Sequence, residues 1–255
     1  AARYSLGIGA KKLMDQYGVD GIDIDWEYPG SGAAGIKSSP QDRENFTLLI
    51  TALRDVLGDD AWLSVAGTGD SAYIRNSAEI NKIAPLITYF NLMSYDFTAG
   101  ETGENARKHQ ANLYPSDLSL PGYSVDDMVN NLIEAGMPSE KILVGVPFYG
   151  RLGATVTKSY DDLRKDYINK NGYEIAFDKQ AQVPYLVKDG KFAMSYDNAL
   201  SIFLKGQYVL RNCLGGIFAW TSTYDQANIL AKYMYQSIYD PDALKSELEQ
   251  VFGQF

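Results

Sequence analysis

The chain has 255 residues, of which 45% are hydrophobic, 22% charged and 13% aromatic, as in an ordinary globular domain. No apolar run approaches the about 18 to 20 residues that a membrane-spanning helix needs, which excludes a membrane protein. Because 32 Asp and Glu outnumber 23 Lys and Arg, the net charge is -9 and no basic field is available to bind nucleic acid.

Short apolar runs with β-branched or aromatic residues alternate with segments of helical periodicity. Strands are predicted at 20–28, 62–68, 89–95, 141–147 and 216–220. Helices are predicted at about 4–17, 39–57, 77–84, 126–135, 197–212 and 225–239. In the second helix, Ser39 is the expected N-cap and Pro40 the expected first-turn proline. Between these elements lie the loop 30–39 and the irregular segments 96–123 and 152–194, and after them comes a polar, amphipathic tail to Phe255.

This alternation predicts an α/β fold with a parallel sheet covered by helices, either a doubly wound sheet or a (β/α) barrel. A closed barrel has eight strands, whereas we count five, preceded by one lone helix. The absent elements would take about 75 to 100 residues of a barrel of about 250. The chain starts without an initiator Met or a signal peptide, so we expect that the true N-terminus is missing.

The strand 20–28 is the most informative segment, because Asp23, Asp25 and Glu27 share one of its faces and apolar residues occupy the other. Three carboxyl groups about 6.5 to 7 Å apart repel one another, which is costly. Such a row lets the inner acids share protons, so that the outermost carboxyl stays protonated and serves as a general acid. A second carboxylate can balance an oxocarbenium-like centre, which favours glycosidic bond cleavage.

Two other interpretations of the acidic row stay open. A solvated edge strand would explain it structurally, although the apolar residues opposite indicate a strand buried between layers. Magnesium or calcium could bind three carboxylates, although no second acidic cluster accompanies them, and we expect no metal or cofactor. The single cysteine, Cys213, lacks the partners that a disulfide or a cysteine metal site requires.

Four motifs resemble those of glycoside hydrolase family 18, the chitinases and their relatives. Residues 20–27 match the D-G-x-D-x-D-x-E signature at the end of the fourth barrel strand. Residues 93–96 resemble M-x-Y-D on strand six, residues 147–151 resemble P-x-Y-G-R after strand seven, and residues 215–220 resemble G-G-x-x-x-W on strand eight. The resemblance spans residues 18–239 and keeps the order of the family.

The resemblance implies a (β/α)8 TIM barrel of which only about five strands are present, in a single catalytic domain over residues 1–255 that lacks its N-terminal strands. Residues 152–194 would form a small α+β insertion between the last two strands. The strand-three segment that supports the carboxylates is absent, so we expect an incomplete site floor in this chain. The loop 97–104 lacks an aromatic residue for sugars beyond the cleaved bond, so we expect weaker binding there.

The resemblance also implies a retaining mechanism in which the 2-acetamido oxygen of the substrate attacks the anomeric carbon. Glu27 would protonate the leaving oxygen and then activate water. Asp25 would orient the acetamide group and balance the charge on the oxazolinium, and Asp23 would buffer Asp25. Tyr95 would hold the acetamide group through its hydroxyl.

Further residues of the motifs would bind the sugar. Trp220 would stack on its apolar face, and Asp96, Tyr149 and Arg151 would hydrogen-bond around it, with Arg151 paired to Asp96 in the empty site. Met93 would pack beneath the site. Ordinary barrel core is the alternative for Met93, Tyr95 and Trp220, and a surface ion pair is the alternative for Asp96 and Arg151.

Other polar and aromatic residues receive structural interpretations. Asp20 has the wrong parity to face the site and is expected to be structural. His109, the only histidine, is expected to be a loop residue rather than a ligand. Most tyrosines of the 152–194 segment are expected to pack within it and some to line the sugar cleft, namely Tyr160, Tyr167, Tyr173 and Tyr185.

The implied function is hydrolysis of β-1,4-linked N-acetylglucosamine polymers or oligomers, with chitin or its oligosaccharides as partner, and neither nucleic acid nor membrane. An endo-β-N-acetylglucosaminidase acting on glycoprotein glycans is one alternative, although such relatives usually lack the insertion. A non-hydrolytic chitin-binding lectin is another, although it typically loses the glutamate present here as Glu27. The insoluble substrate suggests a secreted protein. Endo or exo action, chitin or peptidoglycan as natural substrate, and the oligomeric state stay open.

Overall fold

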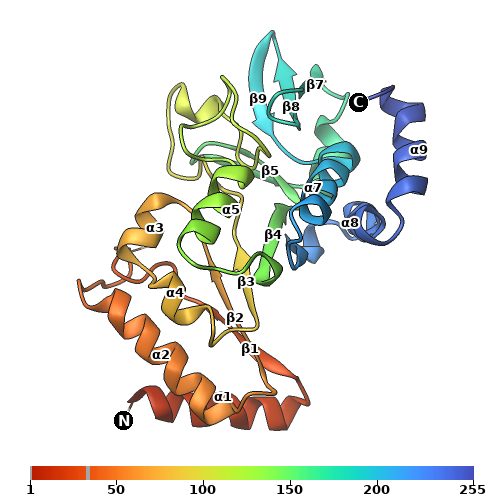
Figure 1. The fold of residues 1–255 in the computed structure, drawn as a ribbon. Coiled ribbons are helices and arrows are strands. Elements are labelled where there is room, and N and C mark those ends of the chain that lie inside the picture. The colour runs from red at the N-terminus through yellow and green to blue at the C-terminus, as the bar shows by residue number, and fades with distance from the viewer. Residues whose placement is uncertain (1, 33–34) are drawn as a thin grey trace. The chain divides into compact units, whose positions relative to one another are not determined.

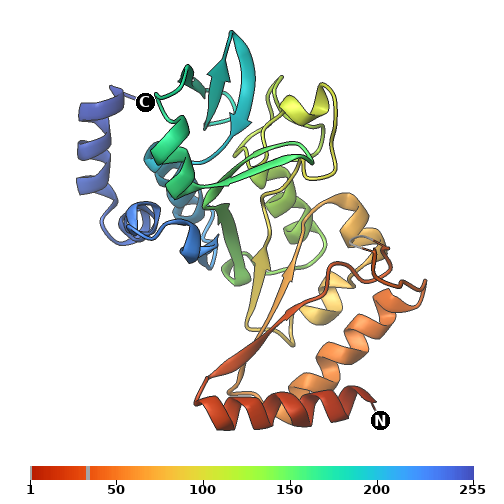
Figure 2. The same cartoon turned by 180° about the vertical axis from the view of Figure 1, so that it is seen from behind.

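The computed structural model describes residues 2–32 and 35–255 (Figures 1 and 2). Residues 33 and 34 of the predicted loop 30–39 lie outside the described residues. The chain divides into two compact units. The first unit comprises 1–92 and 129–143, and the second comprises 93–128 and 144–255.

Three parallel strands form the sheet of the first unit, in the order β1, β2, β3. Their bounds are Gly21–Asp25, Trp62–Gly67 and Tyr89–Leu92. Four helices accompany them: α1 (Ala2–Tyr17), α2 (Asp42–Leu57), α3 (Ser71–Asn76) and α4 (Ile80–Ile83). The parallel pairing confirms the predicted α/β class.

The core of the first unit follows the sequence periodicity. Phe46, Ile50 and Leu53 of α2 recur at helical spacing and are fully buried, as is Val65 of β2. Helix α1 packs on α2 (Figure 1), and a Cβ at Gly7 would meet the Val56 side chain of α2 at 3.1 Å. This packing orders the helices that surround the start of β1.

The second unit contains the strands β4 (Ile142–Pro147, of which the first two residues belong to the first unit) and β10 (Gly216–Trp220), which are neighbours in one sheet. A second sheet is antiparallel in the order β6, β5, β9, β8, β7. Its bounds in chain order are Tyr149–Leu152, Val156–Ser159, Tyr173–Asp178, Val183–Lys188 and Lys191–Ser195.

Helices complete the second unit. They are α5 (Val125–Glu134, shared with the first unit), α6 (Tyr160–Asp162), α7 (Ala199–Arg211), α8 (Ile229–Tyr239) and α9 (Pro241–Phe252). Short 3-10 turns lie at Asn105–Arg107, Ser139–Lys141 and Ser222–Tyr224, and a π turn lies at Leu163–Tyr167. Helices α7, α8 and α9 lie side by side in Figures 1 and 2.

The segment 152–194, predicted to be irregular, contains most of the antiparallel sheet. Its inner face belongs to a core in which Leu163, Leu186 and Met194 pack with Val146 of β4. Apolar alternation in these short strands is weak, because the same segment is rich in Tyr, Lys and Asp. Cross-strand pairing rather than periodicity therefore defines its structure.

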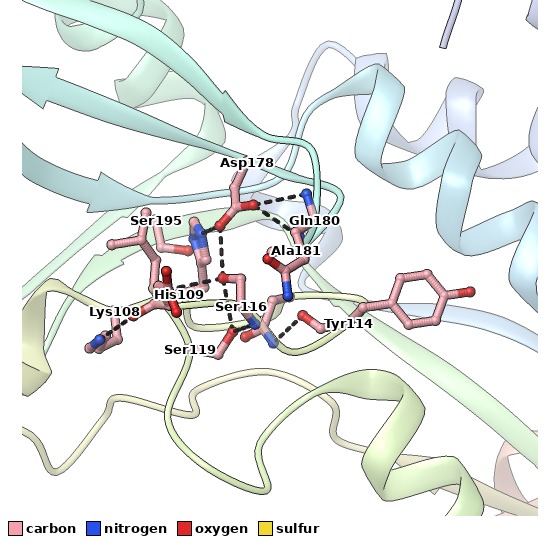
Figure 3. A network of polar contacts seen from close by, with 12 residues as sticks. Lys108, His109, Tyr114, Ser116, Ser119, Asp178, Gln180, Ala181 and Ser195 are labelled. Carbon is pink, nitrogen blue, oxygen red and sulfur yellow. Dashed lines mark hydrogen bonds and ion pairs between the residues drawn. The ribbon is translucent and has the colours of Figure 1, made fainter.

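His109 lies outside helices and strands, as predicted for a loop residue, but it is fully buried. Its Nε2 lies 3.1 Å from Asp178 Oδ2, which also accepts a hydrogen bond from Ser116 Oγ at 2.8 Å (Figure 3). The other oxygen of Asp178 accepts the main-chain N–H groups of Gln180 and Ala181 at 3.0 Å. This network ties the segment 105–123 to the end of β7.

Three predicted elements were wrong in their limits. The predicted helix 77–84 is replaced by α3 and α4, because the Asp70 side chain accepts the N–H groups of Ala72 and Tyr73 and starts a helix earlier. The predicted polar tail contains the helix α9, which buries Leu244 and Leu248. The predicted helix 225–239 begins only at Ile229.

The predicted N-cap of the helix 39–57 was also wrong. Helix α2 begins at Asp42, and Gln41 takes the cap position without a side-chain hydrogen bond. Ser39 instead donates its main-chain N–H to Asp42 Oδ2 at 2.7 Å. Strands β1 and β3 end earlier than predicted, at Asp25 and Leu92. Glu27, at the end of the motif 20–27, and the whole motif 93–96 therefore lie beyond the hydrogen-bonded strands.

Candidate functional site

The acidic row begins on β1. Along this strand Asp23 and Asp25 are exposed, whereas Ile22 and Ile24 are half-buried, so the two faces alternate as predicted. Glu27 follows two residues after the strand end and is also exposed. In this structure β1 pairs with β2, and the apolar side of the row is less buried than the sequence predicted.

Two neutral donors hold Asp23. Ser64 Oγ donates to Asp23 Oδ1 at 2.6 Å, and Asn91 Nδ2 donates to the same oxygen at 2.9 Å. Ser64 lies directly opposite Asp23 in the parallel register, and Asn91 lies on the next strand, β3. The sequence interpretation missed both residues, although each has the parity that brings it to the face of the acids.

Within the acidic row, Asp25 is the residue whose pKa is shifted from its usual value. Partial burial, then the charges of Glu27 and Asp23, and a hydrogen bond shared with Glu27 raise the pKa of Asp25 to about 6. The sequence predicted proton sharing with the outermost carboxyl protonated. In the structure it is the middle residue, Asp25, whose pKa is raised, first by partial burial and then by the acid on either side of it.

Two tyrosines support the end of the row. Burial, together with the charge and hydrogen bond of Glu27, raises the pKa of Tyr28. The Tyr28 ring meets the buried Tyr73 ring edge to face, with 5.9 Å between centroids. Gly67 leaves space for the Tyr73 hydroxyl, which a Cβ at that position would meet at 2.4 Å. Tyr73 could not be predicted from local pattern, because its position depends on α3.

In the second unit, Asp96 joins Tyr149 and Arg151. Asp96 Oδ1 accepts hydrogen bonds from Tyr149 Oη at 2.8 Å and from Arg151 Nε at 2.6 Å. The predicted pairing of Arg151 with Asp96 is therefore present. Burial, then the charge and hydrogen bond of Asp96, raise the pKa of Tyr149, which keeps its hydroxyl protonated. The backbone of Asp96 is left-handed, with φ 62°, a conformation that Asp tolerates better than most residues.

Tyr95 packs by its edge against Tyr149 and Phe218, with centroids 6.4 and 6.3 Å away. Met93 is buried, with 8% of its surface exposed. Trp220 has 54% of its surface exposed at the end of β10, which argues against a role in the core. The second unit thus brings together Tyr95, Asp96, Tyr149 and Arg151, and the first unit brings together the three carboxylates.

The remaining residues discussed from sequence have structural contacts. Asp20 precedes β1, and its carbonyl oxygen accepts the N–H of Trp62 at 3.0 Å. The tyrosines of the segment 152–194 pack within it: Tyr160 is buried, Tyr167 and Tyr173 lie 5.0 Å apart, and Tyr185 stacks on Phe192 at 5.0 Å.

Within residues 2–32 and 35–255, His, Cys, Asp and Glu form no group of three or more suited to a metal ion. Over the same part of the chain, no helix has the length and apolar character needed to cross a membrane. Neither finding assigns a function.

Comparison with known proteins decides the family, since the family model "Glycosyl hydrolases family 18" matches residues 9–225. The chain belongs to glycosyl hydrolase family 18. The family fold is a TIM barrel, and the α/β class with parallel strands described above agrees with it.

Curated relatives of this family 18 chain are chitinases. It is 32% identical to Chitinase A1 of Niallia circulans over 90% of the chain and 38% of the relative. It is 33% identical to Chitinase 1 of Yersinia entomophaga over 80% of the chain and 44% of the relative. It is 30% identical to Endochitinase 1 of Metarhizium robertsii over 89% of the chain and 57% of the relative. The chain therefore spans between 38% and 57% of these proteins.

Two solved structures are also similar. The chitinase domain of the spore coat protein CotE from Clostridium difficile is 74% identical, with a TM-score of 0.66, over 99% of this chain and 73% of that one. A family 18 N-acetylglucosaminidase from Paenibacillus barengoltzii is 32% identical, with a TM-score of 0.84, over 92% of this chain and 75% of that one.

Proposed function

We propose that this family 18 chain hydrolyses β-1,4-linked N-acetylglucosamine polymers or oligomers, with chitin as the substrate class. The observation that carries the proposal is the carboxyl pair of Asp25 and Glu27, which shares a hydrogen bond and gives Asp25 a pKa of about 6. One proton held between two carboxyl groups near neutral pH is what acid and base catalysis on a glycosidic bond requires. The chitinase names of the relatives support the choice of substrate.

The mechanism proposed is retaining and substrate-assisted. The 2-acetamido oxygen of the substrate attacks the anomeric carbon while Glu27 donates a proton to the leaving oxygen, which departs with the bonding pair. Asp25 orients the acetamide N–H and balances the positive charge of the oxazolinium. Glu27 then takes a proton from the attacking water and is ready for another cycle. Asp23, held by Ser64 and Asn91, buffers the charge of Asp25.

The second unit supplies the proposed sugar contacts. Tyr95 holds the acetamide group through its hydroxyl, with Met93 packed beneath it. Trp220 offers an exposed ring for stacking on the apolar face of the sugar. The pairs that Asp96 makes with Tyr149 and Arg151 keep these side chains ready to exchange hydrogen bonds with sugar hydroxyls.

The finer features of the fold are part of the proposal. Strands β1, β2, β3, β4 and β10 represent five strands of the family barrel in one catalytic domain, and residues 152–194 form an α+β insertion before the last strand. The antiparallel pairing within 149–195 supports such an insertion. We place the enzyme outside the cell, because an insoluble polymer must be degraded where it lies.

The test is hydrolysis of a fluorogenic N,N'-diacetylchitobioside by the unchanged chain and by Glu27→Gln. Loss of the general acid is expected to lower kcat by about 10³ without lowering the melting temperature. Glu104→Gln, which changes an exposed glutamate of the second unit, is the matched control and retains the rate. Equal rates for Glu27→Gln and the unchanged chain would refute the proposal. Binding of chitin oligosaccharides without hydrolysis by any variant would favour a lectin, and release of glycoprotein glycans without chitin cleavage would favour an endo-β-N-acetylglucosaminidase.

A further inference from the structure

A cavity with two arginines lies in the first unit, between the chain that follows β1 and the helices α2 and α3. Its volume is about 430 Å³, and Arg43, Arg75, Ser38, Ser39, Gly30 and Asn76 contribute to its lining. We refer to it as the arginine cavity. Figure 1 shows the start of α2 beside α3, and Arg43 Nη2 donates weakly to the carbonyl of Ile74 at 3.4 Å.

The positive charge of the arginine cavity is poorly neutralised. Among the described residues Arg43 pairs with Glu79 at 3.6 Å, whereas Lys82 Nζ lies 2.7 Å from the same Glu79 oxygen, and the carboxylate of Asp42 is engaged by the main-chain N–H groups of Gly30 and Ser39. Arg43 Nε is buried and has no hydrogen-bond partner among the described residues. Arg75 is exposed and makes no ion pair with any part of the chain that the structure describes. Two guanidinium groups therefore face one cavity in a chain of net charge -9.

The wall of the arginine cavity is fixed by the fold. Asp42 Oδ2 accepts the main-chain N–H of Gly30 at 3.3 Å and that of Ser39 at 2.7 Å, which fastens both sides of the intervening loop to α2. Gly30 has φ 71°, and a Cβ there would meet the carbonyl oxygen of Asn76 at 2.7 Å. A glycine is needed for this close approach. A ligand would thus meet Gly30, Ser39 and Asn76 at positions that these contacts hold.

A second cavity connects the arginine cavity with Tyr28, the residue that follows Glu27. This second cavity, of about 400 Å³, shares Gly30 and Asn76 with the arginine cavity and is also lined by Tyr28 and Tyr73. Tyr28 directly follows Glu27 and is hydrogen-bonded to it. Gly30 is three residues beyond Glu27, so at most about 11 Å of chain separates them. A glycan held at Glu27 could therefore place a neighbouring sugar at the arginines.

We propose that the arginine cavity binds a carboxylate carried by an N-acetylated amino-sugar chain, of the kind that the lactyl group of muramic acid supplies. This inference rests on the proposed function and narrows its substrate class to glycans with acidic substituents. A guanidinium group matches a carboxylate in shape and charge, and the hydroxyl of Ser38 in the lining adds a donor for the sugar. The net negative charge of the chain does not prevent this binding, because salt screens charges that lie more than about 8 Å from the ligand. The arginines act on the carboxylate at shorter range.

The test is calorimetric titration in a Glu27→Gln background, which keeps the ligands intact. The two ligands are a tetrasaccharide of alternating N-acetylglucosamine and N-acetylmuramic acid, and the same tetrasaccharide with its lactyl carboxyls converted to methyl esters. They differ in charge and little in shape. We expect the acid to bind about tenfold more tightly than the ester, and about 0.5 M salt to reduce this preference.

Arginine variants identify the groups responsible. Arg75→Gln is expected to reduce the acid-to-ester preference about threefold, and Arg43→Gln with Arg75→Gln to abolish it, whereas Arg75→Lys retains part of it. Arg211→Gln, at an exposed arginine of the second unit, is the matched control and keeps the full preference.

The outcomes separate this inference from the proposed function. Equal affinity for the acid and the ester would overturn the inference that the arginines bind a carboxylate. A preference for the acid that survives the double substitution would overturn it as well. In both cases, binding of the ester would still support a glycan site. Absence of binding by both ligands and by chitotetraose would overturn both proposals.

Discussion

The carboxyl groups of Asp25 and Glu27 share a hydrogen bond, and the pKa of Asp25 is raised to about 6 from its usual 3.8. The two residues are close in the chain, since Asp25 ends β1 and Glu27 follows it by two residues. The folded protein therefore holds a proton on this pair at a pH where an unfolded chain would release it.

Removal of the Asp25 charge tests this coupling. A folded pKa above the unfolded value means that the contribution of Asp25 to stability is complete below about pH 3.8 and is lost as the pH rises through about 6. Asp25→Asn should therefore weaken the pH dependence of the unfolding free energy between these values. At pH 7 the variant should gain at most about 1 kcal/mol, because the group is accessible and water screens its repulsion.

The measurement is urea unfolding across that pH range, with Asp20→Asn as control, since Asp20 is an exposed acid just before β1. The control should retain the slope of the unchanged protein. An identical slope for Asp25→Asn would show that the pair does not share a proton in solution.

Ser64 offers a test of how Asp23 is held. Ser64→Ala removes the donor at 2.6 Å and leaves Asn91 as the remaining partner of Asp23. We expect a loss of about 1 kcal/mol in stability and a fall of about tenfold in kcat. Without the Ser64 hydroxyl dipole the charge of Asp23 is less screened and repels Asp25 more strongly, which raises the pKa of Asp25 further, so the acidic limb of the pH–rate profile should move to higher pH.

Ser71→Ala, which changes an exposed serine at the start of α3, is the control for this experiment. Loss of stability in Ser64→Ala without any shift of the pH–rate profile would assign Ser64 a purely structural role.

The sequence predicted the parts of the site that depend on local pattern. The acids of β1 could be found because strand parity alone places them on one face, and the pairing of Asp96 with Arg151 could be found from the family motifs. Ser64 and Asn91 were missed because their relation to Asp23 depends on the register between strands, which no local pattern contains.

The limits of prediction in the fold have similar causes. Helix α3 was missed because its start is decided by one capping side chain, Asp70, rather than by apolar periodicity. The α+β character of 152–194 was expected from the family resemblance, but its strands could not be placed, because they are stabilised by pairing with one another and by a core that includes Val146 from an earlier strand. His109 was placed in a loop correctly, but its burial depends on Asp178, which is distant in the sequence.

Asp178 is expected to stabilise the second unit. Burial alone would raise the pKa of Asp178, but hydrogen bonds from His109, Ala181 and Ser116 outweigh it and hold the pKa well below the usual value. The stabilisation is present above the unfolded pKa and is lost as the pH falls. Asp178→Asn should therefore cost about 2 kcal/mol at pH 7, and the difference from the unchanged protein should shrink below about pH 4.

Thermal unfolding at several pH values measures this effect, with Asp189→Asn, an exposed acid in the β8–β9 turn of the same sheet, as the control. A melting temperature of Asp178→Asn equal to that of the control at pH 7 would mean that the network in Figure 3 contributes nothing to stability.

Trp220 and Trp62 form a matched pair for testing sugar stacking, because 54% and 58% of their surfaces are exposed. A buried tryptophan replaced by alanine costs about 3 to 5 kcal/mol, whereas neither of these should cost more than about 1 kcal/mol. Trp220→Ala should nevertheless weaken the binding of chitotetraose at least tenfold, since an aromatic face contributes about 1 to 2 kcal/mol to a stacked sugar. Trp62→Ala, at the start of β2, should bind as the unchanged chain does. Calorimetry and thermal unfolding on both variants separate the two roles. A large loss of stability with unchanged affinity for chitotetraose in Trp220→Ala would show that Trp220 has a structural role and does not bind sugar.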